Sequence, residues 1–90
     1  MPLYEVWVIV LPRPALLDPE GETILAAAHR MGDTAIQQVR AGRTFALHIQ
    51  AHSAEEATVH ARSLAEKLLH NPIVETFTLH LPAPLPQTPA

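Results

Sequence analysis

The chain is organised around its first predicted strand, Tyr4-Glu5-Val6-Trp7-Val8-Ile9-Val10-Leu11. This stretch is rich in β-branched and aromatic residues and carries one charge, which favours a β-strand. Side chains alternate between the two faces of a strand, so one face carries Tyr4, Val6, Val8 and Val10, and the other carries Glu5, Trp7, Ile9 and Leu11. Both faces are largely apolar, which is typical of a central strand covered on both sides. The chain has too few predicted helices to cover two faces, so this strand indicates a protein partner.

Length and composition exclude several classes of protein. The chain has 90 residues, enough for one small domain, and its net charge is −3. Neutralising nucleic-acid phosphates requires a concentrated basic face, which this charge does not suggest. There is no cysteine, and no apolar run approaches the roughly 20 residues that span a bilayer. The sequence therefore predicts a soluble, cytoplasmic protein that binds neither nucleic acid nor membrane.

A helix is predicted after the first strand. It opens at Leu17-Asp18-Pro19-Glu20-Gly21, where Asp18 is a good N-cap and proline fits the first helical position. We expect the helix to run to about Met31 and to end at Gly32. The residues expected on its buried stripe, at helical spacing, are Ile24, Leu25, Ala28 and Met31.

Two further strands, Ala35–Val39 and Thr44–Ala51, are predicted to form a hairpin joined at Arg40-Ala41-Gly42-Arg43. Gly42 is the residue there that enters a left-handed conformation cheaply, so we expect a type I turn followed by a glycine bulge. Along the second of these strands, large apolar residues alternate with small or polar ones. Its apolar face carries Phe45, Leu47 and Ile49.

The remaining elements are a second helix and a fourth strand. Ser53 and Glu56 form a capping box that starts the helix. The helix is expected to end near His70, before Asn71-Pro72. Its predicted inner face carries Ala57, Ala61, Leu64, Ala65 and Leu68. A strand at Ile73–His80 follows, and the proline-rich residues 82–90 form a predicted tail outside a single domain at residues 1–81.

The predicted order is βαββαβ, an α+β ferredoxin-like arrangement. In it a four-stranded antiparallel sheet carries two helices on one face. The other face is bare and presents either the Val6/Val8/Val10 row or the Trp7/Ile9/Leu11 row. Such an apolar patch is a liability on a monomer, so we expect oligomerisation through the sheet or its edge, as a homodimer or a dimer of dimers.

A search for chemistry finds no catalytic site, metal site or cofactor site. The six histidines lack carboxylates at ligand spacing, and the glutamate pairs lie in the first turns of helices. No serine lies in a nucleophile turn, and the three glycines form no phosphate loop. Arg40 and Arg43 flank the predicted turn, where a small anion or an acidic loop of a partner could dock. Trp7, with Ile9 and Leu11, is a candidate interface anchor.

Three stretches of the chain carry a resemblance to a known family. They are Leu17–Gly21, Val39–Arg43 with Phe45-Ala46-Leu47, and Leu68–Glu75. In this order and spacing they resemble PurS, the small subunit of phosphoribosylformylglycinamidine synthase, over about residues 3 to 80. The family usually has lysine where this chain has Arg43.

The resemblance implies a role in purine biosynthesis, in a ligase complex of three kinds of subunit. A glutaminase subunit releases ammonia, and a large synthetase, with ATP and magnesium, converts formylglycinamide ribonucleotide to formylglycinamidine ribonucleotide. The small subunit carries no catalytic residues and is thought to join the other two and assist ammonia transfer. The motif positions carried over as fold-determining are Asp18, Gly21, Gly42 and Asn71, and those carried over as docking contacts are Arg40 and Arg43.

Two other functions fit the same sequence. βαββαβ dimers often bind small effectors between subunits, so a regulatory ligand-binding module is the alternative. A small enzyme using a histidine such as His48 as base is the third reading. Ligand binding or turnover by the isolated chain would distinguish these from a PurS-like subunit.

Overall fold

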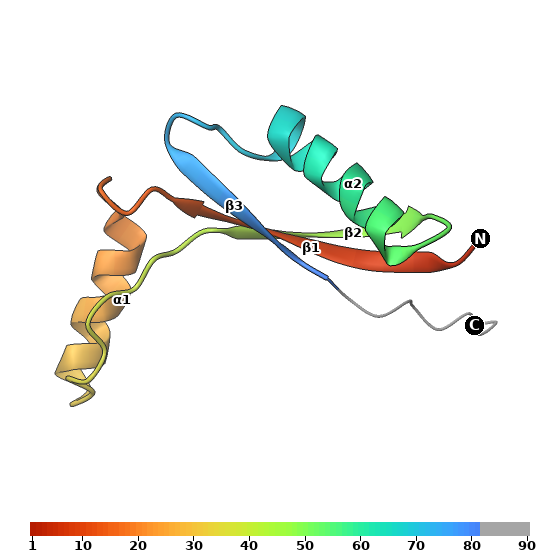
Figure 1. The fold of residues 1–90 in the computed structure, drawn as a ribbon. Coiled ribbons are helices and arrows are strands. Elements are labelled where there is room, and N and C mark those ends of the chain that lie inside the picture. The colour runs from red at the N-terminus through yellow and green to blue at the C-terminus, as the bar shows by residue number, and fades with distance from the viewer. Residues whose placement is uncertain (82–90) are drawn as a thin grey trace.

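The structure is a computed structural model that describes residues 1–81. Its elements are β1 (Leu3–Pro12), α1 (Pro19–Arg30), β2 (Arg43–Gln50), α2 (Ala54–Leu64), a π-helical turn η1 (Ala65–Leu69) and β3 (Glu75–His80). The described strands form one antiparallel sheet in the order β2-β1-β3 (Figure 1). The predicted α+β class and the central position of the first strand are confirmed.

The core forms where α2 lies on one face of β1. Val6, Val8 and Val10 have relative exposures of 1%, 0% and 1%, and Tyr4 is also buried on this face. Ala57, Ala61 and Ala65 face them and are fully buried. Because these residues are small, the helix approaches the sheet closely.

The predicted inner face of this helix is wrong at two positions. Leu64 and Leu68 are 37% and 72% exposed, whereas Leu69 packs against the core. Leu64 lies in the α-helical part, at the edge of the buried stripe. For Leu68 and Leu69 the winding changes from α to π at Ala65–Leu69, and the wider turn rotates these side chains relative to an α-helical stripe. Helical spacing therefore fails at the end of the helix.

The predicted four-stranded sheet is wrong for the described residues, because Ala35–Val39 forms no strand. The prediction that both helices cover one face is also wrong. Figure 1 shows α2 over the sheet and α1 beyond the end of the strands. The ferredoxin-like topology is therefore not confirmed. The reason is that residues 35–42 run back along α1 instead of folding onto β2, as the His29 Nε2 to Ile36 O contact of 2.8 Å shows.

We call residues 17–42, that is α1 with its flanking chain, the arm. The helix in it has the predicted ends, since Asp18 caps it and Gly32 follows it with φ of +96°. Its predicted apolar stripe is not buried within this chain, because Ile24 is 46% and Met31 86% exposed. The radius of gyration is 16.7 Å. A compact chain of this length would have about 12 Å, so the molecule is elongated.

Within residues 1–81 no element covers the face of the sheet opposite α2, and we call it the open face. It carries the Trp7/Ile9/Leu11 row, because the Val6/Val8/Val10 row is buried under α2. Trp7 is 44% exposed. The neighbouring positions opposite Trp7 are Ala46 on β2 and His80 on β3.

Candidate functional site

The base of the arm is organised by the Asp18 carboxylate. Its Oδ1 accepts a hydrogen bond from the Gly21 amide at 3.0 Å, and its Oδ2 accepts one from the Ala41 amide at 2.8 Å. The bond from Ala41, and after it the bond from Gly21, lower the pKa of Asp18. Desolvation opposes this shift, and the nearby charge of Arg40 adds to it. Asp18 therefore joins the start of α1 to the chain that enters β2.

Two glycines allow the backbones at this base to approach closely. A Cβ on Gly21 would lie 2.2 Å from the Val39 carbonyl oxygen, and one on Gly42 would lie 2.1 Å from the Val10 carbonyl oxygen. Among the described residues, only Gly32 has a positive φ. The predicted bulged turn at Gly42 is therefore wrong: this glycine serves close packing against β1, and the chain runs on into β2.

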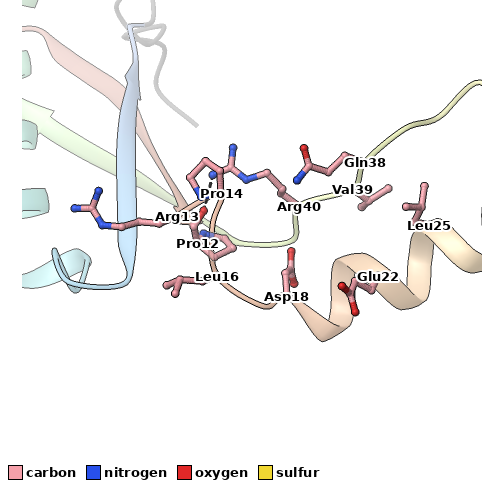
Figure 2. Close-up of a pocket in the computed structure, with 10 residues that line it drawn as sticks. All are labelled: Pro12, Arg13, Pro14, Leu16, Asp18, Glu22, Leu25, Gln38, Val39 and Arg40. Carbon is pink, nitrogen blue, oxygen red and sulfur yellow. Dashed lines mark hydrogen bonds between the residues drawn. The ribbon is translucent and has the colours of Figure 1, made fainter.

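Arg40 lines a pocket of about 200 Å³ between the start of α1 and the end of β1. In Figure 2 its side chain reaches back toward Pro12 and Pro14, whereas Arg13 points toward the opposite side. Arg40 Nη2 donates to the Pro12 carbonyl, and Arg13 donates to the Pro72 carbonyl. Arg40 Nε is buried and finds no partner among the described residues. Both arginines thus help to fix the direction in which the arm leaves the sheet.

Arg43 lies on the surface, where it contacts β3. Its Nη2 lies 3.0 and 2.9 Å from the two carboxylate oxygens of Glu75, and its guanidinium is 5.5 Å from the Phe45 ring centre. The Asn71 amide also donates to Glu75 at 2.8 Å, and this bond, more than Arg43, lowers the Glu75 pKa. Asn71 Oδ1 in turn accepts from the Ile73 amide. The structure therefore places Arg43, Glu75 and Asn71 in one cluster, separate from the pocket that Arg40 lines.

The open face combines apolar and imidazole side chains. The Trp7 and His80 rings are 5.8 Å apart, and His48 Nε2 lies 3.2 Å from the Glu5 carboxylate. Ile9 lies opposite Thr44 on β2 and Thr78 on β3. This arrangement suits contact with another protein surface.

A second surface feature was missed by the sequence reasoning. A groove of about 580 Å³ follows the outer edge of β2 and is lined by residues 46–50 together with His60 and Leu64 of α2. Phe45, Leu47 and Ile49 pack against the core but stay partly exposed beside it. The alternation of apolar and polar residues along β2 could have indicated this groove. The predicted hairpin, however, placed Ala35–Val39 beside the outer edge of β2 and so left no groove there.

The described residues offer no catalytic constellation. Within residues 1–81, no three His, Asp or Glu side chains come together in a way that could hold a metal ion. His70 Nδ1 contacts the Ala65 carbonyl at 2.7 Å, and His60 lies 3.9 Å from Glu56. Over the same residues, no helix combines the length and apolarity needed to cross a membrane.

Comparisons with known proteins agree with this arrangement. The family model described as PurS, phosphoribosylformylglycinamidine (FGAM) synthase, matches residues 5–83. The phosphoribosylformylglycinamidine synthase subunit PurS of Mycobacterium leprae is 36% identical over 70 residues, which cover 78% of this chain and 85% of that protein. The structure of Thermus thermophilus PurS in the P21 form superposes on this chain with a TM-score of 0.85 at 26% identity. The match covers 94% of this chain and 100% of that one.

A chain in the structure of PurLQS from Thermotoga maritima is also similar. It superposes with a TM-score of 0.79 at 30% identity, covering 90% of this chain and 99% of the other. The family model spans nearly the whole chain, and the relatives are matched over most of their own length. The chain therefore belongs to the PurS family, the PurS subunits of phosphoribosylformylglycinamidine synthase in purine biosynthesis.

Proposed function

We propose that this chain is the non-catalytic small subunit of a phosphoribosylformylglycinamidine synthase complex. In this role it bridges the glutaminase and the ATP-dependent synthetase subunits and assists ammonia transfer between them. The observation that carries the proposal is the match, over 99% of its length, to a chain of the Thermotoga maritima PurLQS structure. ATP and magnesium act on the large subunit, and this chain binds no cofactor.

Physical chemistry supports a bridging role. Ammonia is largely protonated near neutral pH and is lost to solvent, so a transfer path between two active sites must be enclosed. An elongated chain with a bare sheet face at one end and an arm at the other can contact two bodies at once. The proposed location is the cytoplasm, and the proposed state is a homodimer or a dimer of dimers.

Two surfaces are proposed as contacts. The first is the open face with Trp7, Ile9 and Leu11, which can bury apolar area against a larger subunit. The second comprises Arg40 and Arg43, whose side chains lie in separate environments. Because Arg43 is exposed while it pairs with Glu75, it can also meet an acidic group of a partner.

The test is synthesis of formylglycinamidine ribonucleotide by the matching large and glutaminase subunits, with and without this chain. Glutamine and ammonium salt are compared as nitrogen sources. We expect glutamine-driven synthesis to require the chain and ammonium-driven synthesis to proceed without it.

If the rates of synthesis from glutamine and from ammonium salt were both the same with and without the chain, the bridging role would be wrong. A screen of the isolated chain for binding of amino acids and nucleotides would then decide whether the regulatory ligand-binding alternative holds.

A further inference from the structure

Two loops meet at the end of the sheet from which the arm leaves. Residues 13–17 follow β1, and residues 71–74 precede β3. The Arg13 amide donates to the Val74 carbonyl at 2.9 Å, and the Arg13 guanidinium donates to the Pro72 carbonyl through Nε and Nη2. In Figure 2 the Arg13 and Leu16 side chains both point toward the blue side of the picture, where β3 begins. The two loops therefore form one surface.

This surface is apolar and exposed. Ile73 is 80% and Leu17 is 74% exposed, and the side chains of Leu16 and Val74 are exposed as well. We call these four residues, together with Arg13, the loop surface. Large apolar side chains that gather on one surface mark a site of protein contact, whereas the same residues scattered singly need no explanation.

The exposure of Leu17 is not explained by the start of α1. Leu17 directly precedes the N-cap Asp18, and an apolar residue at this position often packs on the fourth residue of the helix. In α1 that residue is the charged Glu22, so this packing is not available to Leu17. Its apolar side chain is therefore free for a contact outside the chain.

The exposure of Ile73 is not explained by its turn either. Asn71 Oδ1 accepts from the Ile73 amide at 3.1 Å, and the Asn71 carbonyl accepts from the Val74 and Glu75 amides. These bonds fix the turn without the Ile73 side chain, so a polar side chain would serve the fold equally well. Because the turn is already fixed, docking on it costs little conformational entropy.

Arg13 supplies an unbalanced positive charge beside these apolar residues. Its exposed guanidinium bonds a neutral carbonyl, and within residues 1–81 no carboxylate lies at ion-pair distance from it. Arg40 and Arg43 differ, because Asp18 lies near the first and Glu75 pairs with the second. A guanidinium of this kind is suited to bind a carboxylate.

We propose that the loop surface docks a segment of one of the two large subunits in which an apolar side chain lies next to a carboxylate. The apolar side chain covers Leu16, Ile73 and Val74, and the carboxylate binds Arg13. The inference rests on the proposed function, since it requires the complex, and it adds the surface and the chemistry of the segment that meets it.

A second copy of this chain fits the loop surface less well. A two-fold contact brings the same surface together from both sides. Such a contact would place two Arg13 guanidinium groups near each other, and the loop surface contains no carboxylate to separate them. Charge complementarity therefore favours a different, acidic partner.

The apolar part is tested by a pull-down titration of the chain with the matching synthetase and glutaminase subunits. Ile73→Ser removes a side chain that is exposed in the free chain, so the fold should persist. Val59→Ser, at an exposed apolar position on α2, is the matched control. We expect the half-saturating concentration to rise about tenfold or more for Ile73→Ser, and by less than about twofold for the control.

The carboxylate is tested with Arg13→Gln, whose amide can still donate to the Pro72 carbonyl but carries no charge. We expect weaker binding that also depends less on salt, because salt screens an exposed charge pair. Arg30→Gln, at the exposed end of α1, is the control and should keep the salt dependence of the natural chain.

The outcomes separate this inference from the proposed function. If the natural chain binds and either Ile73→Ser or Arg13→Gln binds equally well, the inference is wrong and the proposed function stands. If the natural chain binds neither large subunit, the proposed function is wrong and the inference falls with it. If Ile73→Ser weakens the association of the isolated chain with itself in light scattering, the loop surface belongs to a contact between copies, which overturns the inference.

Discussion

At the scale of single residues, the base of the arm depends on three positions that the sequence also marked. Asp18 bonds two backbone amides, while Gly21 and Gly42 allow backbone contacts that a side chain would block. The sequence marked Gly42 as a turn residue with a left-handed conformation, which the described chain does not show there. Glycine is needed at this position because the backbone passes close to the Val10 carbonyl. A glycine at a close contact and a glycine at a turn look alike in a sequence.

Gly21→Ala is expected to destabilise the chain by about 1–3 kcal/mol, because the new Cβ would overlap the Val39 carbonyl. Helix propensity alone would predict a gain of roughly 1 kcal/mol, so the sign of the change is diagnostic. Urea unfolding measures it. Ala26→Gly, at an exposed position of the same helix, is the control and should cost about 0.5–1 kcal/mol. A stabilised Gly21→Ala chain would contradict the close contact.

Asp18→Asn is expected to lower stability at neutral pH and to have progressively less effect in acid. The folded-state pKa of Asp18 lies below its ordinary value, so the charged carboxylate contributes stability above the unfolded-state pKa. That contribution is lost as the pH falls below roughly 3.9 and through the lowered folded-state pKa. Thermal melts of both chains from pH 7 to acid measure the difference. A difference independent of pH would show that the charge has no such role.

At the scale of elements, α2 is positioned by its alanines. Ala57, Ala61 and Ala65 bring the helix against the valines of β1, and larger side chains have no space there. Periodicity predicted Ala57, Ala61 and Ala65 correctly and failed at Leu64, at the end of the α-helical part, and at Leu68 in the π-helical turn. Whether the end of a helix changes to π-helical winding depends on how that end packs, and the spacing of apolar residues along the sequence does not show this.

Ala61→Leu is expected to cost about 1–3 kcal/mol or more, because overpacking separates α2 from the sheet. Val59→Leu, on the exposed side of the same helix, is the matched control and should change stability by less than about 0.5 kcal/mol. Thermal melts followed by circular dichroism measure both. Equal effects at the two positions would contradict the packing of α2.

At the scale of the whole molecule, the fully buried core is small and the apolar stripe of α1 is uncovered. We therefore expect the melting temperature to rise with protein concentration, because association stabilises the folded chain by mass action. Differential scanning calorimetry over a hundredfold range of concentration measures this. A melting temperature that did not change with concentration would contradict the homodimer.

A charge exchange separates the internal role of Arg43 from a docking role. Arg43→Glu breaks the pair with Glu75, whereas Arg43→Glu/Glu75→Arg restores an internal pair of opposite orientation. If Arg43 docks on an acidic group of the synthetase or the glutaminase subunit, both variants should bind that subunit more weakly in a pull-down titration. Recovery of binding in the double variant would limit Arg43 to its pair with Glu75.

The central first strand, both helix starts, the end of α1 at Gly32 and the family could be predicted from the sequence, because caps, alternation and motif spacing are local signals. The position of Ala35–Val39 could not be predicted in this way and is known from the fold alone. A period-two pattern specifies an edge-pairing segment but not which edge it meets, within the chain or in another copy. That choice follows from contacts between distant residues, Gly21 with Val39, Asp18 with Ala41 and Gly42 with Val10, which direct the arm away from its own sheet.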